Sequence, residues 1–137
     1  MDAKRLVIGT LVGGIAMYVL GYLIFELAFG TFYAANAGSA TGVMRDVSLV
    51  WAVALGSLSY AALVTLAMGN RAGSSTIGAG LKIGAVVGFL LWFTADFTLY
   101  GITNTANLTR TVVDPLLELV RGGIVGAVIG AALGKLA

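Results

Sequence analysis

Four long apolar runs constrain this chain more than any other feature of its sequence. They cover residues 6–29, 48–68, 80–103 and 115–136, and short polar segments separate them. A helix needs about 20 mostly apolar residues to cross a bilayer, and each run is long enough. We therefore expect one domain, residues 1–137, that folds as an all-α membrane protein with a four-transmembrane-helix bundle. The first run exceeds the about 7–15 apolar residues of a signal peptide, which favours a retained helix.

The composition supports a membrane location and excludes several classes of function. Hydrophobic residues make up 59% of the chain and charged residues 10%, whereas soluble domains carry about 25% charged residues. His and Cys are both absent, which excludes catalysis by an imidazole or a thiolate and removes the commonest zinc ligands. We expect no enzymatic activity, no metal site and no cofactor. The net charge of +2 comes without a basic run, so the expected partner is the lipid bilayer and not nucleic acid.

The distribution of Lys and Arg predicts how the chain crosses the membrane, because cytoplasmic loops carry an excess of these residues. If the N-terminus is cytoplasmic, the positive residues on that side are Lys4, Arg5, Arg71, Lys82 and Lys135. Arg45 and Arg110 then lie outside, so we expect both termini inside. The pattern L-x-I-G-x-x-x-G occurs at residues 6–13 and again at 81–88, which suggests that the bundle consists of two duplicated helical hairpins.

Ionisable residues inside the apolar runs form the first candidate site. Glu26, Asp96, Glu118 and Arg121 fall in the outer half of the expected bundle, where a charge costs about 2.5–3.5 kcal/mol to insert. The rise of a helix places Asp96 and Arg121 at one depth, so we predict an ion pair between them, with Glu118 on the other side of Arg121. This buried polar cluster is either a structural clasp or a site for a proton or small cation, since acids outnumber the base.

The polar turn before the fourth run is the second candidate region. Tyr100, Thr103, Asn104 and Asn107 belong to a segment rich in side chains that hydrogen-bond backbone groups. They are expected to satisfy the carbonyl groups at the end of the third helix, or alternatively to form a site that faces the outer water. Asp114 precedes a proline, which predicts that Asp114 is the N-cap of the fourth helix.

Glycines recur at intervals of four residues in the last two runs. They are Gly84 and Gly88 in the third run, and Gly122, Gly126 and Gly130 in the fourth. Such rows let helix backbones approach closely in lipid, and they predict either internal packing of the bundle or a seam between copies of the chain. We therefore expect a non-enzymatic accessory or scaffold subunit that self-associates or joins other membrane subunits. The alternative is a small proton- or cation-coupled transporter or channel that uses the polar cluster.

The second half of the chain resembles a group of small, uncharacterised bacterial four-helix integral membrane proteins. The resemblance rests on Asp96 in the third run, on the turn Y-G-I-T-N-T-A-N-L-T of residues 100–109, and on V-V-D at residues 112–114. It implies a four-helix fold and a location in the bacterial plasma (inner) membrane. It implies no particular activity.

Overall fold

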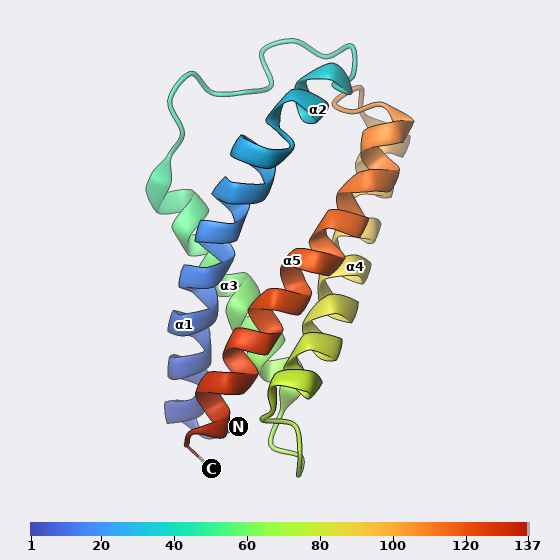
Figure 1. The fold of residues 1–137 in the computed structure, drawn as a ribbon. Coiled ribbons are helices and arrows are strands. Elements are labelled where there is room, and N and C mark those ends of the chain that lie inside the picture. The colour runs from blue at the N-terminus through green and yellow to red at the C-terminus, as the bar shows by residue number, and fades with distance from the viewer. Residues whose placement is uncertain (137) are drawn as a thin grey trace.

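The computed structural model describes residues 1–136, which form helices joined by loops (Figure 1). The elements are α1 (Ala3–Gly21), the π-helix η1 (Tyr22–Ala28), α2 (Gly30–Ala35), α3 (Val50–Met68), α4 (Ile77–Ile102) and α5 (Leu108–Gly134). Within the described residues, α1 with η1, α3, α4 and α5 are long and apolar enough to cross a membrane. The predicted all-α fold with four membrane helices is therefore confirmed. Residues 30–35, which we expected to be loop, form the short helix α2.

The helices form two hairpins. α1 packs mainly against α3, and α4 packs along most of its length against α5. α1 also contacts α5, whereas α3 makes few contacts with α4 or α5. Both chain ends lie at one end of the bundle, here called the terminal end, and α2 lies at the other, the α2 end (Figure 1). α1 and α5 are close at the terminal end and separate toward the α2 end (Figure 1).

Loop contacts join the hairpins at both ends of the bundle. At the α2 end, Ala37 and Ala106 form an isolated antiparallel bridge, and the amide of Ala40 donates to the carbonyl of Asn104 at 3.0 Å. At the terminal end, the guanidinium of Arg5 on α1 donates to the hydroxyl of Ser75 in the α3–α4 loop. The apolar core occupies the terminal half; its buried members are Met17, Tyr60, Ala61, Val64, Met68, Val125, Ile129 and Leu133.

α4 and α5 touch backbone to backbone along their glycine rows. A Cβ atom on Gly84 would overlap the carbonyl oxygen of Gly122, and one on Gly126 would overlap the carbonyl oxygen of Gly80. Gly88 lies against the carbonyl of Glu118, and Gly130 against that of Thr76. These glycines are buried within one chain, so a seam with a second copy would have to use other residues.

The predicted start of the last helix is wrong. α5 begins at Leu108, and Asn107 is its N-cap, whose side chain accepts from the amide of Arg110 at 2.9 Å. Asp114 and Pro115 lie inside α5, where the proline removes one helical hydrogen bond. Asn and Asp are equally good caps, so capping preference alone does not distinguish Asn107 from the predicted Asp114. Asn107 has an added advantage, because its side chain donates to Asn36 of the α1–α3 connection at 3.0 Å.

Candidate functional site

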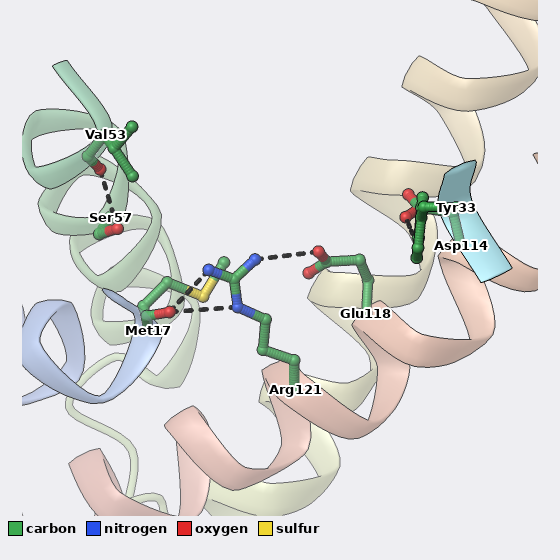
Figure 2. Close-up of polar contacts among 7 residues, drawn as sticks. All are labelled: Met17, Tyr33, Val53, Ser57, Asp114, Glu118 and Arg121. Carbon is green, nitrogen blue, oxygen red and sulfur yellow. Dashed lines mark hydrogen bonds and ion pairs between the residues drawn. The ribbon is translucent and has the colours of Figure 1, made fainter. Parts of the chain in front are cut away.

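Arg121 of α5 is the centre of the buried polar layer (Figure 2). Its Nη1 donates to Glu118 Oε1 at 3.0 Å. Its Nε and Nη2 both donate to the carbonyl oxygen of Met17 on α1, at 3.2 and 2.6 Å. The guanidinium carbon also lies 5.3 Å from the centroid of the Phe25 ring. The charge of Arg121, which cannot lose its proton, is thus balanced by one carboxylate, one backbone carbonyl and one aromatic face.

The approach of α1 to α5 at this level depends on the absence of a side chain at Gly21. A Cβ atom there would overlap the guanidinium of Arg121. One turn earlier, the carbonyl of Met17 points at the same guanidinium (Figure 2). The π-helix η1 begins directly after Gly21. Single π-helical turns are frequent at functional sites, because they change the direction of the side chains that follow.

The predicted ion pair between Asp96 and Arg121 is wrong. Arg121 pairs instead with Glu118, three residues earlier on its own helix, and this is the ion pair found within residues 1–136. The half-buried Asp96 faces Asp114 across the α4–α5 contact. The cause is the early start of α5, which puts Asp114 on a helical turn facing α4, while Glu118 needs no second helix to reach Arg121.

The predicted place of Glu26 in the buried cluster is also wrong. Glu26 lies on η1 and is exposed, whereas Glu118 and Arg121 are 2% and 8% exposed. No ion pair of Glu26 is found within the described part of the chain. Its side chain instead lines two cavities that also contain Arg121.

Tyr33 and Arg110 extend the site to the α2 end, and the sequence analysis missed both. The hydroxyl of Tyr33 on α2 donates to Asp114 Oδ1 (Figure 2). The guanidinium carbon of Arg110 lies 4.8 Å from the centroid of the Tyr33 ring. Burial, followed by the hydrogen bond to Asp114, raises the pKa of Tyr33 above its usual range, so Tyr33 stays a neutral donor at physiological pH. No sequence spacing links position 33 to position 114, and no signal in the sequence predicted this contact.

Three cavities meet at Arg121. The first, of about 620 Å³, lies between α3 and α4 and is lined in part by Tyr60, Trp92 and Arg121. The second, of about 460 Å³, lies between α1 with η1 and the start of α3. The third, of about 480 Å³, lies between η1 with α2 and α5, and is lined in part by Trp92 and Glu118. We call this third space the α2-end cavity.

Four buried polar atoms around this layer have no hydrogen-bond partner within residues 1–136. They are two donors and two carboxylate oxygens: Tyr60 Oη, Trp92 Nε1, Asp96 Oδ2 and Glu118 Oε2. Buried polar atoms are nearly always hydrogen-bonded in native proteins, either to protein or to ordered water. We therefore expect these four atoms to be hydrogen-bonded to ordered water or to another group that the described residues do not supply.

The residues predicted for the outer turn serve the loop contacts at the α2 end. Thr103 is the C-cap of α4, and its hydroxyl donates to the carbonyl of Leu99 at 2.6 Å. Asn104 accepts from Ala40 through its carbonyl, and Asn107 caps α5. Tyr100 is 42% exposed on α4. The turn therefore closes the α2 end, while the cavity itself is lined by other residues.

Comparisons with protein families, with curated proteins and with solved structures find no match to this chain. Within residues 1–136, no group of three or more acidic side chains is placed to hold a metal ion. The class of this protein is therefore inferred from the length and hydropathy of its helices. On that evidence, the chain is a small integral multi-pass membrane protein.

Proposed function

We propose that this protein is a small proton- or cation-coupled transporter or channel whose path crosses the polar layer at Arg121. The observation that carries the proposal is Glu118, a carboxylate that is 2% exposed and has one oxygen without a partner in the described residues. Ionisable side chains inside membrane spans are costly and usually mark ion or proton pathways. A purely structural clasp would be fully paired, because a half-satisfied polar network destabilises a core.

The arrangement of the cavities supports a path through the layer. Two cavities lined by Arg121 also have Trp92 in their walls, and one of them has Glu118, so water that entered them would reach the polar layer. Unpartnered buried atoms of this kind are usually satisfied by internal water. Asp96 on α4 and Asp114 on α5 lie close to one another, and Glu118 is one turn farther along α5. Rows of acidic side chains inside membrane spans serve as proton relays. Protons could then pass between the Asp pair and Glu118 while Arg121 stays charged.

The proposal is tested by proton uptake into proteoliposomes. With an imposed membrane potential, vesicles containing the protein should acidify faster than protein-free vesicles, as measured with a trapped pH-sensitive dye. Asp96→Asn and Glu118→Gln should both reduce uptake to the protein-free rate, because each removes a group that can carry the proton. Asp46→Asn, an exposed acid outside the cavities, is the matched control and should leave uptake unchanged. Uptake no faster than in empty vesicles, with protons, Na⁺ and K⁺ alike, would contradict the proposal.

The remaining expectations about this chain belong to the same proposal. We place the protein in a bacterial inner membrane, with the terminal end in the cytoplasm, because Lys4, Arg5, Arg71 and Lys135 gather there. We also propose that it is not an enzyme. The resemblance of the turn at residues 100–109 to small bacterial four-helix proteins supports the location.

An accessory role in a larger membrane complex is the second candidate function. The cavity between α3 and α4 is lined by the small residues Gly56, Ser57 and Ser59, and a Cβ atom on Gly56 would meet nothing within 4 Å. Small residues on an open helix face accept a partner helix closely. Gly56→Leu should then abolish co-purification of a partner or second copy in mild detergent. Gly101→Leu, at an equally open glycine, should leave co-purification unchanged. If the unsubstituted protein is strictly monomeric and has no partner, the accessory role is excluded.

A further inference from the structure

The α2-end cavity carries charges of both signs that the protein itself does not pair. Its lining includes Glu26 on η1 and Arg110 on α5. Within residues 1–136 neither of them has an ion-pair partner. Arg110 is held in place by the face of Tyr33, which leaves the guanidinium hydrogens available. A molecule with one cationic and one anionic group would pair with both of these charges.

The position of the cavity matches the depth of a phospholipid headgroup and the start of its acyl chains. Arg110 is near the beginning of α5, and Arg121 lies roughly 16 Å farther along the helix. The cavity therefore runs from the level of the span ends toward the middle of the membrane. Its deeper walls include the apolar side chains Phe25 and Trp92. Aromatic residues are enriched at membrane interfaces, at the level of the lipid headgroups.

We propose that the α2-end cavity binds a phospholipid whose headgroup carries a phosphate and a primary ammonium, as phosphatidylethanolamine does. Arg110 binds the phosphate through charge-assisted hydrogen bonds. Glu26 binds the ammonium, and Asp114, held by Tyr33, lines the same cavity. The unpartnered oxygen of the almost fully buried Glu118 gives a further acceptor in the lining. A quaternary ammonium has no N–H to donate, so the site discriminates against phosphatidylcholine.

The lipid proposal does not require proton transport, although Glu118 belongs to both sites, and the test measures binding alone. Trp92 lines the cavity, and Trp51→Phe removes the other tryptophan, which is 69% exposed. In bilayers of increasing brominated lipid content, brominated phosphatidylethanolamine should quench Trp92 at about a tenfold lower mole fraction than brominated phosphatidylcholine, as expected for one charge-assisted hydrogen-bonded contact. Glu26→Gln and Arg110→Gln should each remove this preference. Both side chains are at least partly exposed, so neither substitution is expected to unfold the protein.

Matched controls and one competition experiment decide the outcome. Arg45→Gln and Asp46→Asn change exposed charges on the α1–α3 connection outside the cavity, and both should keep the tenfold preference. Equal quenching by the two lipids would overturn the proposal, as would a preference that survives Glu26→Gln. Relief of quenching by soluble phosphoethanolamine would overturn the lipid assignment and show that the cavity binds a free zwitterion. Loss of proton uptake in a protein that keeps its lipid preference would contradict only the proposed transport function.

Discussion

Replacing Glu118 with Met is expected to lower the free energy of unfolding by about 3–5 kcal/mol, as is typical when one partner of a buried ion pair is removed. Arg121 would remain 92% buried, since its residue is 8% exposed. It would keep the carbonyl of Met17 and the ring of Phe25 as neighbours but no carboxylate. Because a guanidinium does not give up its proton, the charge could not be removed by titration.

Arg121→Met should lower the free energy of unfolding less than Glu118→Met does. The double variant should lower it less than either single change. Arg121→Met leaves Glu118 alone, but a buried carboxylate can take up a proton and become neutral. In the double variant Glu118→Met/Arg121→Met both charges are gone, and most of the loss should be recovered. Titration of SDS into mixed micelles, followed by tryptophan fluorescence, gives the three free energies of unfolding. A double variant as unstable as Glu118→Met would mean that the pair contributes packing and not charge balance.

The second large effect is expected at the backbone contact between α4 and α5. Gly126→Ala should lower the free energy of unfolding by at least about 3 kcal/mol, the upper end for overpacked cores. The added methyl group would overlap the carbonyl oxygen of Gly80, and a backbone atom cannot move aside as a side chain can. The two helices would have to separate over several turns.

Gly78→Ala is the matched control for this prediction, because it adds the same methyl group on α4. Nothing lies within 4 Å of the position that its Cβ would take. Alanine favours a helix over glycine by up to about 1 kcal/mol, so the control should be neutral or slightly stabilising. The same unfolding titration measures both variants. Equal losses at Gly78 and Gly126 would show that helix propensity, and not close contact, explains the glycines.

The membrane helices could be predicted because bilayer thickness fixes how long an apolar run must be. The predicted run 48–68 differs from α3 by two residues at its start. The run 80–103 differs from α4 by three residues at its start and one at its end. The start of α5 was harder, because two good capping residues compete there. Contacts with the α1–α3 connection through Asn36 favour Asn107, and such a long-range contact leaves no trace in local sequence.

The sequence predicted which residues belong to the polar cluster better than it predicted which of them form an ion pair. Depth arithmetic places Asp96 and Arg121 at one level, but it gives no information about which way each side chain turns around its helix. Glu118 reaches Arg121 from the same helix, so that contact was the simpler one to form. The exposed Glu26 lies on η1, and a π-helix has no signature in residue periodicity that would have predicted it.

The two ends of the bundle differ in how they resist being pulled apart. The terminal half is held by interlocking apolar side chains and by glycines in direct contact, which can separate only by leaving empty space. The α2 end is closed by a few loop hydrogen bonds, among them that of Ala40 to Asn104. Water can replace each of these with only a small change in free energy. We therefore expect local opening of the structure to begin at the α2 end. Water or a ligand would then enter the bundle from that end.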